Sequence, residues 1–246
     1  MYLPAHLPMS TIDAPTRERR ATLARSPETT SVPPPDARAS APPALLPLYE
    51  APAAFDGLYA EIADCPRCVL ARDRSRTVPG SGPAPCDLMF VGEGPGERED
   101  ELGLPFVGRS GQFLDELLAS IGRSRRDVYV TNVVKCRPPG NRDPQPAEIE
   151  ACAGFLERQI AVVRPAVIAT LGRFSMARWF PSERISRIHG EARTFHAPTE
   201  GAPEGVTVIP MYHPAAALRD GSLRAVMRQD FARIPALLTD STGASR

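Results

Sequence analysis

The hydrophobic positions of this chain fall into short runs that are separated by polar segments. Four of these runs have the length and composition of buried β-strands, and they lie at residues 88–91, 128–130, 166–171 and 206–209. Each run is followed within two residues by a glycine, an asparagine or a proline, which ends the apolar pattern. The pattern therefore predicts four short strands that are buried on both faces.

Apolar residues with helical spacing occupy much of the sequence between and after these strands. The helical pattern covers residues 111–121, 146–163 and 223–238. Pro146 suits the first turn of the second helix, where Glu148 and Glu150 are also favourable. Strands that alternate with helices are typical of an α/β fold, in which a mostly parallel sheet is covered by helices on both faces.

The chain divides by composition into a tail and one domain. It has 246 residues, of which 42% are hydrophobic, enough for one sizeable core. Residues 1–52 are rich in proline, alanine, serine and threonine and cannot bury enough apolar surface to offset their ordering entropy, so we expect a disordered tail. We expect the folded domain at residues 53–240 and a short C-terminal tail at 241–246.

Charge and targeting signals narrow the class of protein. The formal net charge is zero, so no global basic field indicates a nucleic-acid partner, although a local basic face remains open. Lys135 is the only lysine, which leaves a single side-chain amine for Schiff-base chemistry. No apolar run reaches membrane-spanning length and no signal peptide is evident, so we expect a cytoplasmic protein with reduced thiols.

Four of the five cysteines have a spacing that indicates a metal centre. Cys65 and Cys68 form a C-x-x-C pair, and Cys136 and Cys152 follow as separate residues. Four thiolates could hold a [4Fe-4S] cluster or a tetrahedral zinc ion, and the spacing fits either. Buried apolar cysteines are the alternative. Cys86 has no partner spacing, so we interpret it as a packing residue.

Residues that could bind a ligand or take part in catalysis lie just past the predicted strand ends. Residues 92–96 read Gly-Glu-Gly-Pro-Gly, a loop whose N–H groups could face a ligand, although a plain turn explains it equally well. The amide of Asn132 suits the edge of a nucleobase, and His213 could donate to a developing oxyanion. Each signal is weak alone, but ligands bind beyond the carboxyl ends of parallel strands, so we expect these residues to converge.

Four motifs in order, together with the cysteines, are similar to a known family. They are residues 92–96, residues 105–111 (Pro-Phe-Val-Gly-Arg-Ser-Gly), residues 132–142 and His213-Pro214. From about Cys65 to about Leu237 the chain resembles the family 4 uracil-DNA glycosylases, which are iron–sulfur members of the uracil-DNA glycosylase superfamily. The resemblance implies a central four-stranded, mostly parallel sheet between helices. It also implies hydrolysis of the N-glycosidic bond of deoxyuridine in base excision repair, without strand cleavage.

The resemblance implies roles for particular residues of the site. Phe106 would stack on the flipped uracil, Asn132 would read its edge, and Glu99 would hinder the methyl group of thymine. Gly94 would lie against the base through its backbone. Glu93 would position water or stabilise charge on the sugar, His213 would face O2 of the leaving base, and Asn141 would help at the reacting centre. Four of the cysteines (Cys65, Cys68, Cys136 and Cys152) would hold a structural [4Fe-4S] cluster.

The resemblance also implies a partner, which is uracil-containing DNA, single- or double-stranded. Leu218 would be an apolar wedge in the minor groove, with Arg219 beside it, and Arg187 and His189 would contact phosphates. We expect a monomer without membrane contact, and nothing indicates the partner of the N-terminal tail.

Three alternatives remain at this stage. Arg187-Ile188-His189 is similar to a tripeptide of a related subfamily that cross-links to DNA through histidine. A non-catalytic uracil-DNA-binding module would keep the scaffold, but its usual sign, loss of Asn132 or His213, is not present. An iron–sulfur redox protein is the third alternative, and no flavin or nicotinamide fingerprint supports it.

Overall fold

The computed structural model describes residues 53–196 and 204–243. The tail expected at residues 1–52 lies outside this part of the chain. Within the described ranges, no helix combines the length and the apolar character that crossing a membrane requires.

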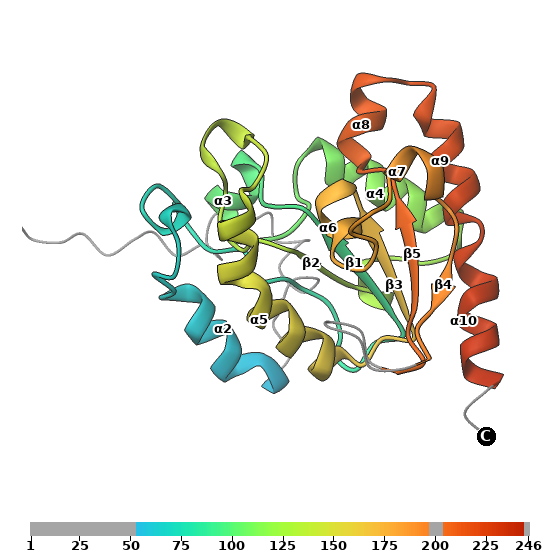
Figure 1. The fold of residues 1–246 in the computed structure, drawn as a ribbon, viewed down its shortest axis with the longest axis horizontal. Coiled ribbons are helices and arrows are strands. Elements are labelled where there is room, and N and C mark those ends of the chain that lie inside the picture. The colour runs from blue at the N-terminus through green and yellow to red at the C-terminus, as the bar shows by residue number, and fades with distance from the viewer. Residues whose placement is uncertain (1–52, 197–203, 244–246) are drawn as a thin grey trace, which may run out of the picture. The chain divides into compact units, whose positions relative to one another are not determined.

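A five-stranded sheet with the order β2-β1-β3-β5-β4 forms the centre of the domain (Figure 1). Its parallel strands are the four predicted ones, β1 (Leu88–Gly92), β2 (Tyr129–Asn132), β3 (Val167–Leu171) and β5 (Thr207–Met211). The fifth strand, β4 (Arg193–Thr194), pairs antiparallel at the edge. The predicted α/β class is confirmed. The sheet has one strand more than the four predicted, because β4 consists of two exposed residues and leaves no apolar pattern in the sequence.

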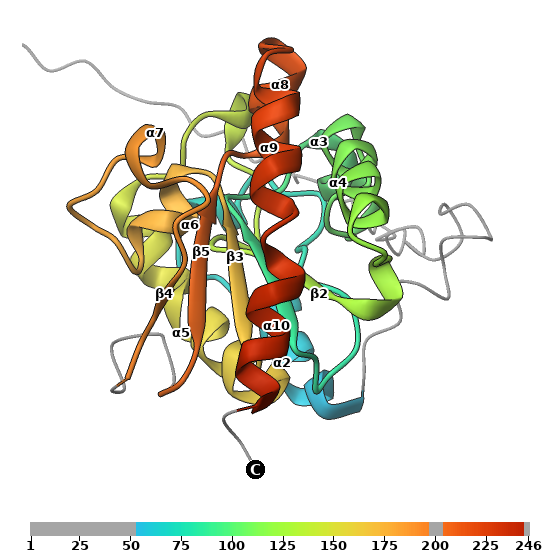
Figure 2. The same ribbon diagram turned by 90° about the vertical axis from the view of Figure 1, so that its right-hand side faces the viewer.

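Helices cover both faces of the sheet, so the domain has three layers (Figure 2). Helices α2 (Asp56–Ala63) and α5 (Pro146–Val163) pack on one face, where Met89 and Val91 of β1 point. Helix α4 (Arg109–Ser120) packs on the other face with the two C-terminal helices, against the alternate residues of β1. Every residue of the four parallel strands is buried, which explains why their sequences are continuous apolar runs.

The predicted closing helix over residues 223–238 is wrong as a single element. The structure has two helices there, α9 (Leu223–Phe231) and α10 (Ile234–Gly243). Pro235 explains the break, since proline lacks an N–H group and its ring clashes with the carbonyl four residues earlier, whereas the first turn of a new helix tolerates it. Helix α10 also continues past residue 240, where we expected the domain to end.

Short helices follow the carboxyl ends of all four parallel strands. After β1, β2, β3 and β5 these are α3 (Glu97–Leu102), η5 (Pro139–Asn141), α6 (Arg173–Ala177) and α8 (Pro214–Arg219). The remaining short elements are η2 (Ala53–Phe55), η3 (Val69–Ala71), η4 (Arg125–Asp127) and α7 (Ile185–Ile188). The four helices that follow the parallel strands, and the loops that lead to them, therefore begin at the same edge of the sheet.

Candidate active site

A cleft of about 880 Å³ opens at the carboxyl ends of the parallel strands. Each strand contributes to its lining at or just past its last residue, with Glu93 after β1, Asn132 at the end of β2, Gly172 after β3 and His213 after β5. The expected convergence of the glycine-rich loop, Asn132 and His213 is therefore confirmed. The backbone of Gly94 lines the same cleft.

Asn132 presents an unsatisfied hydrogen-bond acceptor in this cleft. Its side chain is only 1% exposed, and its Oδ1 has no hydrogen-bond partner within the described part of the chain. A Cβ added at Gly92 would overlap both this Oδ1 and the ring of Phe106, so the absence of a side chain at Gly92 lets the two groups pack directly against its backbone. A buried orphan acceptor costs free energy unless a ligand supplies the donor.

Phe106 lies in a loop that a carboxylate organises. The Oε1 of Glu99 accepts hydrogen bonds from the backbone N–H groups of Val107 and Gly108, both at 2.8 Å. The Phe106 ring is 5% exposed and stacks against the imidazole of His213 with ring centroids 5.7 Å apart. Glu99 lines the cleft and visibly shapes the loop, while its expected action against a methyl group stays a prediction.

His213 is held as a neutral hydrogen-bond donor. It is the N-cap of α8, and its Nδ1 accepts a hydrogen bond of 3.1 Å from the N–H of Ala215. Burial lowers the pKa of His213 to about 4, and the charge of Arg219 acts in the same direction. With Nδ1 accepting and the ring neutral, the proton resides on Nε2, which can donate to a ligand atom.

Glu93 is a half-buried carboxylate beside the start of α6. Its Oε1 accepts a hydrogen bond of 3.1 Å from the N–H of Phe174, and burial raises its pKa above the usual value of 4.5. Gly172 has φ 102°, and a Cβ there would overlap the Glu93 carboxylate, so glycine makes room for it. The ion pair between Arg173 and Asp143 lies close enough to influence the same carboxylate.

Asn141 lines the cleft from the loop that follows Cys136. Its backbone is left-handed, with φ 54°, and its Oδ1 accepts a 2.8 Å hydrogen bond from Nε of Arg137. Arg142 ties this loop to α5 through two hydrogen bonds of 2.6 and 2.9 Å to the carboxylate of Glu148, which is 2% exposed. The loop is therefore anchored on the helix that carries Cys152.

Comparison with known proteins identifies the family of this site. Residues 79–234 match the family described as the Uracil DNA glycosylase superfamily. The chain belongs to this superfamily. The match includes every strand of the sheet and all the residues of the cleft described above.

Curated relatives cover most of the chain. A protein of Archaeoglobus fulgidus named Type-4 uracil-DNA glycosylase is 45% identical over 185 residues, which are 73% of this chain and 91% of its own length. Proteins with the same name from Saccharolobus solfataricus (43% identical, 75% of this chain and 87% of their own) and Sulfurisphaera tokodaii (42%, 71% and 80%) are also similar. The resemblance seen in the motifs is confirmed.

Of the four residues predicted to contact DNA, only one lines the cleft. Leu218 and Arg219 lie in α8, and Arg219 reaches the rim of the cleft. Arg187 lies in α7 and is exposed. His189 is engaged, since its Nδ1 lies 2.8 Å from a carboxylate oxygen of Asp230 and its ring packs on a tyrosine that lines the cleft. None of Leu218, Arg187 and His189 lines the cleft itself.

The four cysteines of the predicted metal centre converge on a second, much smaller pocket. Cys65 and Cys68 follow α2, Cys136 follows β2, Cys152 lies on α5, and all four line this pocket. Arg74 donates from Nη1 to Sγ of Cys136 at 3.3 Å, and the same pocket contains Lys135. In the described ranges, no group of three or more His, Cys, Asp or Glu side chains is arranged so that it could hold a single metal ion. Four thiols with two neighbouring cations match the chemistry of an anionic thiolate cluster.

Cys86 lies apart from these four thiols. It is buried in the core, and its thiol donates to the carbonyls of Leu88 and Asp127 at 3.3 and 3.4 Å. The interpretation of Cys86 as a packing residue is confirmed.

Several residues of the site have no sequence signal that would have revealed them. Gly172 follows a strand, as many glycines do, and only the structure shows that it makes room for Glu93. Glu148 was expected only to favour the start of α5, but it also anchors the Asn141 loop. Arg125 contacts the loop of Phe106 from 19 residues away in sequence.

Proposed function

We propose that the chain is a uracil-DNA glycosylase that hydrolyses the N-glycosidic bond of deoxyuridine, releases uracil and leaves an abasic site in base excision repair. The observation that carries the proposal is the unpartnered Oδ1 of Asn132, which is buried close to the ring of Phe106 in the lining of the cleft. A free acceptor close to an aromatic ring suits a flat base with a donor on its edge. The names of the relatives support the same activity.

The reaction begins with extrusion of the base, because the glycosidic carbon is not accessible inside a stacked duplex. Phe106 stacks on the extruded uracil, and the backbone of Gly94 borders the base. The Oδ1 of Asn132 accepts from N3–H of uracil while its amide nitrogen donates to O4. Cytosine reverses donor and acceptor at this edge, so it leaves the buried amide unsatisfied and is rejected.

Bond cleavage depends on groups that stabilise the charges that develop on the base and on the sugar. The departing uracil carries negative charge, which the Nε2–H of His213 stabilises at O2. The sugar becomes cationic, and the carboxylate of Glu93 supports it and orients the attacking water. Asn141 lines the same cleft as part of the anchored loop and assists at the reacting centre. Glu99 limits the space at C5 of the base.

The cysteine pocket fits a [4Fe-4S] cluster held by the four thiolates, whose role is structural. When bound, the cluster cross-links the turn after α2, the loop after β2 and helix α5. Arg74 and Lys135 are placed to offset the negative charge of the thiolates. The cross-link holds the segment that leads from Cys136 to Asn141.

The remaining assignments are the DNA contacts, the oligomeric state and the location of the protein. Uracil-containing DNA, single- or double-stranded, crosses the face formed by α7 and α8, where Leu218 wedges into the minor groove and Arg187, His189 and Arg219 contact the backbone. The protein acts as a monomer on genomic DNA, in the cytoplasm, where its thiols stay reduced.

A strand-cleavage assay tests this function. Oligonucleotides with uracil opposite guanine, opposite adenine and in single strands should yield abasic strands that break only after alkali or heat. Matched oligonucleotides with thymine or cytosine at the same position serve as controls and should stay intact. Binding of the uracil strands without any alkali-labile product would contradict the proposal in favour of a non-catalytic module.

The same assay should show no Schiff base, for a structural reason. Lys135 is 1% exposed, and its Nζ donates to Oγ1 of Thr131 at 2.8 Å and to the carbonyl of Asn132 at 2.5 Å. An enclosed amine cannot reach the sugar, so borohydride should trap no protein–DNA adduct. An adduct that disappears in Lys135→Ala would contradict this, and one that forms without borohydride and disappears in His189→Ala would indicate cross-linking.

The acid side of the pH–rate profile should report Glu93. Burial raises the pKa of Glu93 above its usual 4.5 and lowers that of His213 to about 4, so Glu93 takes up its proton first as the pH falls. We expect kcat/KM to fall with a single proton, at a pH above 4.5. Glu93→Gln should remove this step, whereas Glu101→Gln on the exposed face of α3 should retain it. A step near the ordinary histidine value of about 6.5 that persists in Glu93→Gln would contradict the neutral His213.

A further inference from the structure

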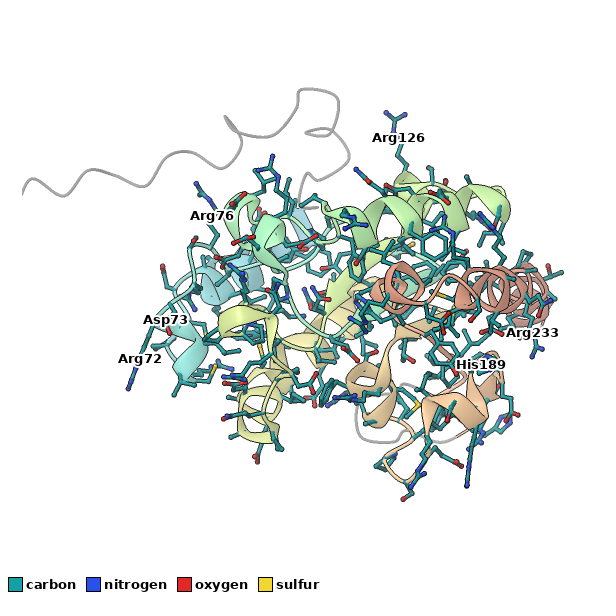
Figure 3. All side chains as sticks on the ribbon, turned by 90° about the horizontal axis from the view of Figure 1, so that it is seen from above. Arg72, Asp73, Arg76, Arg126, His189 and Arg233 are labelled. Atoms are coloured by element: carbon teal, nitrogen blue, oxygen red, sulfur yellow. The ribbon has the colours of Figure 1, made fainter. Side chains whose placement is uncertain are left out.

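A buried arginine lies directly behind the loop that carries Phe106. Arg125 is in η4 and is only 7% exposed, whereas its neighbour Arg126 points into solvent (Figure 3). From this position Arg125 faces the main chain of the loop between α3 and α4. Residues 106–108 of the same loop line the cleft, and Arg125 does not.

The guanidinium of Arg125 joins this loop to the first turn of α4. Its Nη2 donates to the carbonyl of Phe106 at 3.0 Å and to the carbonyl of Gly111 at 3.2 Å. Its Nε donates to Oδ1 of Asp115 at 2.5 Å, and its Cζ lies 5.9 Å from the centroid of the Phe106 ring. Arg125 therefore binds the carbonyl side of the turn, while Glu99 binds the N–H side.

The turn needs such support because its conformation is unfavourable. Phe106 has φ 53°, a left-handed conformation that bulky residues rarely adopt. Its carbonyl rests directly on the Cα of Gly111, where an added Cβ would overlap it. Without the donor for its carbonyl, the Phe106 backbone can relax into an ordinary conformation and the ring then leaves the position it holds against His213.

The arrangement does not favour a purely stabilising role. Within the described residues, the Nη1 of Arg125 is buried and has no hydrogen-bond partner, which costs free energy. The partner carboxylate of Asp115 is 53% exposed, so it remains solvated if the arginine is replaced. An apolar side chain of similar length can therefore be tolerated by the fold.

We propose that Arg125 is a positioning residue for base recognition, which holds Phe106 in its left-handed conformation so that the ring is ready to stack on the extruded base. This inference rests on the proposed stacking role of Phe106. Arg125 touches neither the base nor the sugar and acts only through the Phe106 loop. Binding of the base therefore depends on Arg125, whereas binding of the DNA backbone does not.

The test measures inhibition by free uracil, because free uracil contacts the base pocket without the DNA backbone. In Arg125→Met we expect the inhibition constant to rise roughly threefold to tenfold, the range expected for a misplaced aromatic contact. Affinity for a duplex with a stable abasic-site analogue should stay within twofold of wild type. The matched control Arg126→Met should change neither quantity. Melting temperature and iron content verify that each variant is folded.

A double-mutant cycle separates positioning from a general effect. Phe106→Ala alone should weaken uracil inhibition by roughly tenfold to a hundredfold, since stacking is lost altogether. Adding Arg125→Met to Phe106→Ala should then have no further effect, because the ring through which Arg125 acts is gone. An equal effect of Arg125→Met in both backgrounds, or a parallel loss of abasic-site affinity, would overturn the proposal.

Failure of the proposed site and failure of the positioning role give different results. If Phe106→Ala leaves uracil inhibition unchanged, the stacking role itself is wrong and the role of Arg125 falls with it. If Phe106→Ala weakens inhibition and Arg125→Met does not, only the positioning role is wrong. Should Arg125→Met be poorly folded, Arg125→Lys keeps the charge but lacks the branched donor, and the same outcomes apply to it.

Discussion

Replacing Asn132 by aspartate is expected to lower kcat/KM on uracil by roughly 100- to 1,000-fold, with a weak gain of activity on cytosine. The substitution keeps the size and shape of the side chain but removes its only donor. At the edge of uracil, an acceptor then faces the acceptor O4. The new carboxylate also repels the negative charge that uracil acquires as it departs, so transition-state binding suffers more than ground-state binding.

The structure makes Asn132→Asp a clean substitution. The Oδ1 of Asn132 accepts no hydrogen bond from the described residues, and Lys135 bonds to the main-chain carbonyl of Asn132, which is unaffected by the change. Single-turnover rates on uracil and cytosine oligonucleotides give the specificity, and the melting temperature verifies the fold. Asn132→Ala is the companion variant, and it should lose uracil excision without gaining cytosine. Unchanged uracil excision in Asn132→Asp would show that Asn132 does not read the base.

Cys136→Ala should remove the cluster and destabilise the whole site. Protein purified without oxygen should be brown and contain about four irons per chain. The variant should lose the visible absorbance and the iron, become less soluble, and melt lower by on the order of 10 °C, because cluster binding contributes directly to folding. Activity should fall as well, since the loop from Cys136 to Asn141 loses its attachment.

Cys86→Ala is the matched control for this experiment. Cys86 is buried to the same degree as Cys136, at 8% and 7% exposed, but it lies outside the cysteine pocket. Its replacement should cost core packing alone and leave iron content and visible absorbance unchanged. Stoichiometric zinc without iron in the wild-type protein would contradict the iron–sulfur assignment, and iron retained in Cys136→Ala would contradict the role of that thiol.

Local patterns in the sequence were sufficient where the physical cause is local. The bounds of α5 agree with prediction because Pro146 marks its first turn and the apolar period is regular. The four parallel strands were predictable because burial on both faces leaves uninterrupted apolar runs. Local patterns failed at β4, which is too short and exposed to leave a pattern, and at Pro235, whose effect on a continuous period was overlooked.

The candidate site was predictable as a group of residues but not as a set of interactions. Parallel strands carry their carboxyl ends to one edge, so the order of motifs alone predicted that Glu93, Asn132 and His213 would meet. The spacing of the cysteines likewise predicted their convergence. What each group contacts could not be derived in this way, because hydrogen-bond partners and burial depend on segments that are distant in sequence.

The sequence by itself thus determined the α/β fold, the family and the residues that gather at the cleft, since these follow from local periodicity and motif order. Only the tertiary structure decided their chemical state. Burial holds His213 neutral and raises the pKa of Glu93, and packing leaves the Asn132 acceptor without a partner. Packing also places Arg125 on the carbonyl of Phe106, 19 residues away, because desolvation and long-range hydrogen bonds arise only when separate segments come together.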